Sequence, residues 1–200
     1  MRLFIIIIYI SIFLLSYAVP LLAGPFGLDM GMTLQQVKKV SSIKPSKGSF
    51  IYYSAKLPKN HISFEKYVLY ITPKNGLCKI SAIGKDVTTS VYGNQLISEY
   101  EQIEKTLTSK YGKSDHKFDY LNNGSIWNND NEWTMALKLK ERMLQTPWAG
   151  ISTSLPDSLK SVVLEAFASD ANTGYFTVDY EFENYSDCVR EARKVEQDSL

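Results

Sequence analysis

The 200-residue sequence is poor in the residues that carry most enzyme chemistry. It has two histidines and two cysteines, and neither His61 nor His116 has a Cys, Asp or Glu at the spacing of metal ligands. A Gly-x-Ser-x-Gly elbow, a P-loop and a dinucleotide-binding fingerprint are all missing. We therefore expect no catalytic residue, no metal and no cofactor, with both histidines in exposed loops. A general-base role for His116 is the alternative.

An excess of charge of one sign is also missing. The chain has 22 basic and 21 acidic residues, and removal of Arg2 with the N-terminal segment would make the two numbers equal. A neutral chain lacks the basic field by which nucleic-acid-binding proteins displace counterions. It also lacks a general attraction to anionic lipid. The sequence therefore predicts no nucleic-acid partner, and contact with a membrane only if the N-terminal segment is retained.

The one long apolar run lies at the N-terminus. Arg2 is followed by an apolar stretch at 3–15 and by small residues up to Ala23. This order is typical of a secretory signal peptide. We expect a signal at 1–23, cleaved after Ala18 or after Ala23, and a mature protein that is periplasmic or secreted. The alternative is an uncleaved inner-membrane anchor, since a membrane-spanning helix needs roughly 20 apolar residues.

Export leads to a specific expectation for the two cysteines. Cys78 is in phase with Ile80 on the inward side of a predicted strand, and Cys188 shares a helical stripe with Ala192. Both cysteines therefore face a core, and an even pair in an oxidising compartment readily forms a disulfide. The sequence predicts a Cys78–Cys188 bond; the alternative is two buried thiols that act as small apolar residues.

The first half of the chain reads as a helix followed by strands. Thr33 can cap the free amides of a short helix and Gln36 can reach back to it, and Pro45 closes this segment. A turn is expected at 73–76, where Gly can adopt a positive φ. Three runs rich in Tyr, Ile and Val predict a meander of strands: 50–55, 66–72 and 77–83.

The second half repeats this order. Apolar residues at steps of four, three, four and four predict a helix at 95–111, which Gly112 can terminate. Alternation at 133–140 favours a strand, although its Met, Ala, Leu and Lys also suit a helix, so the choice within 132–146 stays open. Three further segments are expected: strands at 162–168 and 176–182, and an amphipathic helix at 186–200.

Runs of strands between helices predict one α+β domain at 24–200. Its helices would flank antiparallel β-meanders in the order α-βββ-α-βββ(β)-α. Each half has a helix followed by a meander, which is compatible with a structural duplication, but the sequence contains no convincing repeat.

Two resemblances follow from short motifs. Residues 31–37, Gly-Met-Thr-Leu-Gln-Gln-Val, resemble the helix start of the SmpA/OmlA-type outer-membrane-assembly lipoprotein domain. That family carries a lipidated Cys, which this chain lacks, so membership of the barrel-assembly machinery is not implied. The mature chain is also similar to uncharacterised exported bacterial proteins, to which no activity is attached. The short motifs that carry this similarity are Gly124-Ser125-Ile126-Trp127, Glu141-Arg142 and Tyr180-Glu181-Phe182.

Tryptophans gather in one part of the sequence. Trp127, Trp133 and Trp148 lie on either side of Glu141 and Arg142. Because Trp and Arg dominate binding hot spots, Trp127, Trp133, Arg142 and Trp148 form a possible interface. The alternative is a core Trp packed on the sheet, with an ion pair of Glu141 and Arg142 at its rim.

These features predict an exported bacterial envelope protein that binds a protein partner and is not expected to be an enzyme. Two alternatives stay open. One is a periplasmic inhibitor or immunity-type protein that blocks an enzyme in the same compartment. The other is a hydrolase whose site matches no motif, for which His116 would be the first residue to test.

Overall fold

The computed structural model describes residues 24–114, 116–149 and 154–198, and all elements below lie within them. The first half contains η1 (Pro25–Gly27), α1 (Leu34–Val40), β1 (Lys44–Pro45), β2 (Ile51–Ser54), β3 (Phe64–Thr72), β4 (Gly76–Gly84) and β5 (Val87–Thr88). The second contains α2 (Asn94–Tyr111), β6 (Phe118–Leu121), η2 (Asp130–Glu132), α3 (Trp133–Lys138), β7 (Arg142–Ala149), β8 (Leu159–Ala168), β9 (Thr173–Phe182) and α4 (Tyr185–Gln197). The predicted signal at 1–23 lies outside the described residues.

The strands form one nine-stranded sheet, and every described pairing is antiparallel. Its order is β1-β2-β3-β4-β9-β8-β7-β6, with β5 beside β9. Two meanders therefore meet where β4 pairs with β9, and the pairing of Ser81 with Asp179 lies at that junction. This arrangement confirms the α+β class with antiparallel β-meanders.

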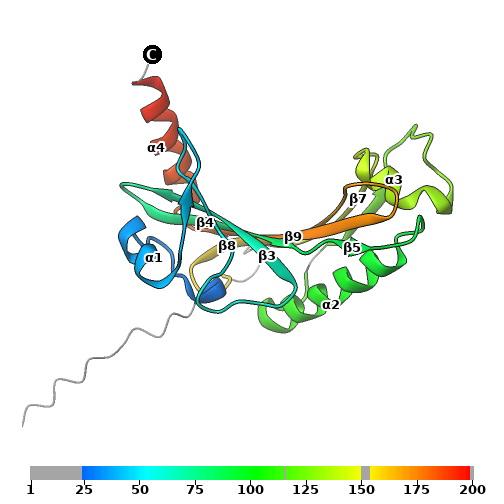
Figure 1. The fold of residues 1–200 in the computed structure, drawn as a ribbon, viewed down its shortest axis with the longest axis horizontal. Helices are drawn as coiled ribbons and strands as arrows, with labels where there is room; N and C mark the ends of the chain where they lie inside the picture. The colour runs from blue at the N-terminus through cyan, green and yellow to red at the C-terminus, as the bar shows by residue number, and fades with distance from the viewer. Residues whose placement is uncertain (1–23, 115, 150–153, 199–200) are drawn as a thin grey trace, which may run out of the picture.

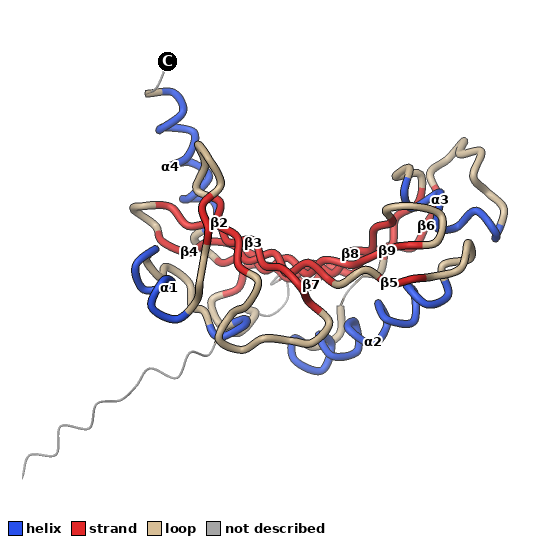
Figure 2. The backbone as a smooth tube through the Cα atoms, viewed as in Figure 1, coloured by secondary structure: helices blue, strands red, loops and turns tan. Residues whose placement is uncertain are grey.

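The sheet bends into a trough whose convex side is covered by helices (Figures 1 and 2). α1 and α2 lie beneath that side, while α4 rises at one end of the trough and the β6–α3 region at the other (Figure 1). One continuous core fills the space between helices and sheet. A single row of paired residues shows how it crosses the sheet: Leu69, Ile80, Tyr180, Val162 and Trp148, all buried.

Local capping signals in the sequence are reproduced. The Thr33 N–H donates to Gln36 Oε1 at 2.8 Å, and the Gln36 N–H donates to Thr33 Oγ1 at 3.3 Å. This reciprocal pair is the predicted capping box at the start of α1. At the C-terminal end of α2, the longest described helix, Gly112 takes a φ of 86° directly after Tyr111, as expected for a residue that terminates a helix.

The prediction of a strand at 133–140 is wrong, because Trp133–Lys138 is the helix α3. Thr134, Ala136 and Leu137 are its buried residues, a spacing that fits a helix face and not a strand. The segment is also led in by a capping box, in which the Asn129 N–H donates to the Glu132 carboxylate. The strand of this region comes later, as β7.

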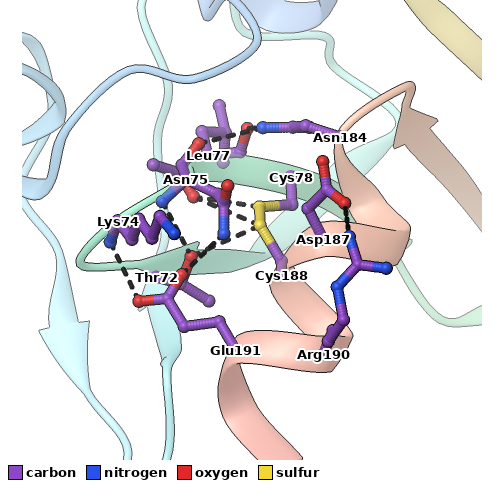
Figure 3. The surroundings of a disulfide bond; sticks show 11 residues. Thr72, Lys74, Asn75, Leu77, Cys78, Asn184, Asp187, Cys188, Arg190 and Glu191 are labelled. Carbon is purple, nitrogen blue, oxygen red and sulfur yellow. Dashed lines mark hydrogen bonds and ion pairs between the residues drawn. A yellow bond between two sulfur atoms is a disulfide. The ribbon is translucent and has the colours of Figure 1, made fainter. Parts of the chain in front are cut away.

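The predicted disulfide between Cys78 and Cys188 is present. The two Cα atoms are 6.5 Å apart and both side chains are completely buried. Hydrogen bonds around it fix the start of α4 to the β3–β4 turn (Figure 3). Asn184 Nδ2 donates to the carbonyl of Leu77, and the Glu191 carboxylate accepts from the Lys74 N–H. The bond therefore joins the last helix to the first meander.

Within the described residues, no helix combines the length and the apolar character needed to cross a bilayer.

Candidate functional site

Among the described residues, no helix lies along the concave side of the sheet (Figure 2). Paired residues on neighbouring strands point to the same face, so the register identifies the side chains there. One row across this side consists of Tyr53, Val68, Ser81, Asp179, Val163 and Pro147. None of them is buried, in contrast to the core row on the other side. We call this side the open face, defined by that row and its neighbours on the same face.

The neighbouring positions on the open face are rich in aromatic side chains. Tyr70 lies one row away on β3, and Phe167 and Tyr175 form a stacked pair with ring centres 5.4 Å apart. On the edge strand, Phe118 and Tyr120 face the same way and are 38% and 44% exposed. Aromatic side chains partly open to solvent are enriched at protein–protein interfaces. The open face therefore has the composition of a binding surface.

The centre of the open face holds a compact ionic cluster. Lys79 Nζ is 3.0 Å from Asp179 Oδ2 and 3.4 Å from Glu181 Oε1. Burial would lower the pKa of Lys79, but the attraction of the two carboxylates outweighs it, so this pKa is raised above its ordinary value. Lys79 therefore stays charged and paired, and the cluster is a charged feature among the aromatic, aliphatic and small side chains of the open face.

α4 overhangs one end of the open face. Its Tyr185 lies against Tyr70 with ring centres 6.1 Å apart, and Val189 lies one turn further along the helix. Between α4 and the sheet is an open hollow of about 260 Å³, with Val68 and Ser81 on its floor. The hollow extends the open face into a pocket that a protruding side chain of a partner could fill.

The polar cluster most similar to an enzyme site lies between α2 and β7. Lys117 Nζ is 2.8 Å from Glu104 Oε2, and the Thr146 hydroxyl donates to Glu104 Oε1 at 2.6 Å. The nearby Ser114 hydroxyl lies between the backbone carbonyl oxygens of His116 and Pro147. Among the described residues, no imidazole is hydrogen-bonded to this hydroxyl, so a Ser–His pair of the kind that activates a nucleophile is not found there.

The two histidines are exposed and make different contacts. His61 accepts the Ser63 N–H at Nδ1, and the ring of His116 lies 6.2 Å from that of Phe118. Asp115, beside His116, lies outside the described residues. In the described part of the chain, no group of three His, Cys, Asp or Glu side chains is placed to hold a metal ion.

We predict that Tyr100 makes the protein sensitive to alkali. Its hydroxyl is buried, 2.8 Å from Thr146 Oγ1, and burial raises the pKa of Tyr100 well above its ordinary value. The folded state then keeps a proton that the unfolded chain releases, so stability is full below about pH 10 and falls as the pH rises beyond it. The free energy of unfolding, measured in urea at increasing pH, should fall less steeply for Tyr100→Phe than for the parent. The difference in slope should be up to about 1.4 kcal/mol per pH unit.

The exposed Tyr92 supplies the control for this experiment. Tyr92→Phe should lose stability with pH as steeply as the parent. Equal slopes for Tyr100→Phe and the parent would contradict the prediction.

The four residues of the predicted tryptophan interface do not form one cluster. Trp148 is buried in the core, and its Nε1–H donates to the Gly112 carbonyl at 2.9 Å. The Arg142 guanidinium lies 5.7 Å from the centre of the Trp133 ring and 2.7 Å from Asp119. Trp127 lies half-buried in the loop after β6. An interface role for Trp127, Trp133 and Arg142 stays a prediction, while Trp148 has the position of a core residue.

The open face was not recognised from the sequence. The alternation of Thr177, Asp179 and Glu181 with buried neighbours was visible on one strand. That signal identifies one polar side of one strand, but it does not show which strands lie beside it. Only the pairing of β4 with β9 brings the aromatic positions of both halves onto one surface.

No known protein family, curated protein or solved structure matches this chain.

Proposed function

We propose that this chain is an exported protein of the bacterial envelope that acts by binding a protein partner on its open face. The observation that carries the proposal is a concave sheet side that no helix of the described chain covers, lined by half-exposed aromatic and aliphatic side chains around a paired ionic cluster. Proteins bury such surfaces against partners, because exposed apolar area is costly in water. Export is supported by the disulfide, which persists in oxidising compartments, and by the apolar N-terminal run.

The shape of the trough favours a protein partner with a convex surface. The rising ends, formed by α4 and by the β6–α3 region, would contact the flanks of such a partner (Figure 1). Tyr70, Tyr53 and Val163 would provide the apolar contacts, and the Lys79 cluster would provide directional polar ones. A protruding aromatic or aliphatic side chain of the partner would enter the hollow between α4 and the sheet, which Tyr185 lines.

Site-specific photocrosslinking in the native host tests the proposal. A photoreactive residue placed at Val163 or at Tyr70 should give an adduct of one discrete mass with an envelope protein. The same residue at Glu101 or Lys105, both exposed on α2 and away from the open face, should give none. The captured protein, once purified, should bind the parent chain, and Val163→Asp should weaken this binding at least about tenfold, since a buried unpaired charge is costly.

The matched control is Glu101→Lys, which should leave the affinity within about twofold because exposed charges contribute little. Absence of adducts from both open-face positions, or equal adducts from the open face and α2, would refute this use of the surface. A captured enzyme that loses activity on binding would assign the chain to the inhibitor or immunity-type class.

A further inference from the structure

Residues 24–200, which are formally neutral as a whole, consist of two oppositely charged parts. Residues 24–90 hold ten lysines against three acidic residues, a formal charge of +7, whereas residues 91–200 hold eleven basic and eighteen acidic residues, a charge of −7. Residues 24–90 include α1 and the first meander, and we call them the basic lobe. α4 packs on this lobe but carries three charges of each sign, so it does not neutralise it. Such a separation of charge creates a local field that a whole-chain count hides.

Three of the ten lysines of the basic lobe line one groove. Lys44, Lys56 and Lys66 line an open groove of about 700 Å³ beside the C-terminal end of α1, and all three are exposed. Of the described residues that line it, Glu65 is the one that is acidic. Among the described residues, no carboxylate forms an ion pair with any of these three lysines. We call the groove lined by Lys44, Lys56 and Lys66 the lysine groove.

Exposed apolar side chains accompany this positive charge. Val40 lines the groove and is 41% exposed, and Ile62, in the loop that follows Lys56, is 80% exposed. Lys66 Nζ lies 4.6 Å from the centre of the Tyr53 ring, so an aromatic ring also lies at the groove. Lysines beside exposed aliphatic and aromatic side chains are the combination by which peripheral proteins bind an anionic bilayer: the charges attract headgroups and the apolar groups enter the interface.

The start of the described chain lies at the same lobe. The Lys59 N–H donates to the Phe26 carbonyl at 2.9 Å, and Gly27 packs against Pro58, a residue that lines the groove. The apolar run at 1–23 therefore joins the domain beside the lysine groove.

We infer that the lysine groove docks the protein on an anionic phospholipid surface, with the acidic half directed away from it. This inference goes beyond the proposed function and uses the edge of the sheet, where the lysine groove meets the open face at Tyr53. A nucleic acid is the less suitable polyanion, because it offers no apolar layer for Val40 and Ile62. The membrane contact would hold the protein at the bilayer while the part of the open face around Tyr70 and Val163, which do not line the groove, remains available to a partner.

Vesicle co-sedimentation of residues 24–200, which include every described element, tests the inference. We expect binding to vesicles in which about one third of the lipid is phosphatidylglycerol, and none to pure phosphatidylcholine. Binding should be present at about 0.1 M NaCl and lost at about 0.5 M, because salt screens exposed charges. The triple variant Lys44→Gln/Lys56→Gln/Lys66→Gln should bind roughly 100-fold more weakly, since each lysine near an anionic surface contributes about a fivefold factor.

The matched control removes the same charge from the other half. Lys105→Gln/Lys113→Gln/Lys138→Gln changes three exposed lysines and should leave vesicle binding within about twofold. No binding to anionic vesicles at low salt would overturn the inference, as would equal losses in the two triple variants. Tighter binding to a single-stranded oligonucleotide than to the vesicles would overturn it in favour of a nucleic-acid partner. The crosslinking positions Val163 and Tyr70 do not line the lysine groove, so the two proposals fail separately.

Discussion

Cys188→Ser is expected to lower the free energy of unfolding by about 4–5 kcal/mol, the entropy change for a closed loop of this length. The Cys78–Cys188 bond spans 110 residues of sequence and joins the first turn of α4 to β4. The loss is a large part of the roughly 5–15 kcal/mol that stabilises a typical domain. For a chain of this size it corresponds to a fall of about 10–20 °C in the melting temperature. The unpaired thiol would also remain completely buried at position 78.

Thermal unfolding with and without reductant is the measurement. Reductant should lower the melting temperature of the parent strongly and that of Cys188→Ser hardly at all. The double variant Cys78→Ser/Cys188→Ser should be about as stable as either single variant, because both changes remove the same bond. Mass spectrometry of exported, non-reduced protein should find no free thiol. Two free thiols, or a variant that still responds to reductant, would contradict the prediction.

Gly76→Ala is the second change with a large expected effect. Gly76 begins β4 with a φ of 68°, and a Cβ atom there would lie 2.2 Å from the Gly31 carbonyl oxygen. That backbone cannot yield easily, because the Gly31 N–H donates to Leu77 and the Leu77 N–H donates to Met32, both at 2.9 Å. A left-handed conformation costs about 1–2 kcal/mol and overpacking about 1–3 kcal/mol. We therefore expect a loss of about 2–5 kcal/mol in the free energy of unfolding measured in urea.

Gly48→Ala separates the two causes. Gly48 has nearly the same φ, 67°, but no atom lies within 4 Å of a Cβ built there. It should lose only the conformational part, about 1–2 kcal/mol. If the two variants were equally destabilised, close approach to Gly31 would contribute nothing, and the account of this turn would be wrong.

Local signals in the sequence were sufficient for most elements. The helix expected at 95–111 is Asn94–Tyr111, and the strand expected at 176–182 is Thr173–Phe182. The capping box at Thr33 was predicted for the same reason: its partners are three residues apart, and short-range hydrogen bonds do not depend on the rest of the fold. The burial of Cys78 and Cys188 was also predicted correctly, but the β3–β4 register shifts at Cys78, and the two cysteines lie outside the core cluster that contains Ile80.

The segment at 133–140 shows where local signals fail. Eight residues are too few to separate a period of two from a period of 3.6 when the composition suits both. The helix is selected by contacts outside the segment. The Thr134 hydroxyl donates to the Ser90 carbonyl at 2.9 Å, and Trp133 packs on Gly93 at the start of α2. These partners lie about forty residues away, so no pattern within the segment contains the information.

By itself, the amino-acid sequence determined the class of fold, the period of each strong element and the pairing of the two cysteines, since each follows from interactions between near neighbours or from the number of residues of a kind. Only the tertiary structure decided which surfaces exist. β4 and β9 are about one hundred residues apart in sequence, and their pairing creates the open face from strands of both halves. The folding of α1 against the first meander likewise gathers lysines that a whole-chain count sees as cancelled by distant acids. Surface chemistry depends on which charges and rings lie within a few ångströms of one another, and long-range packing sets those distances.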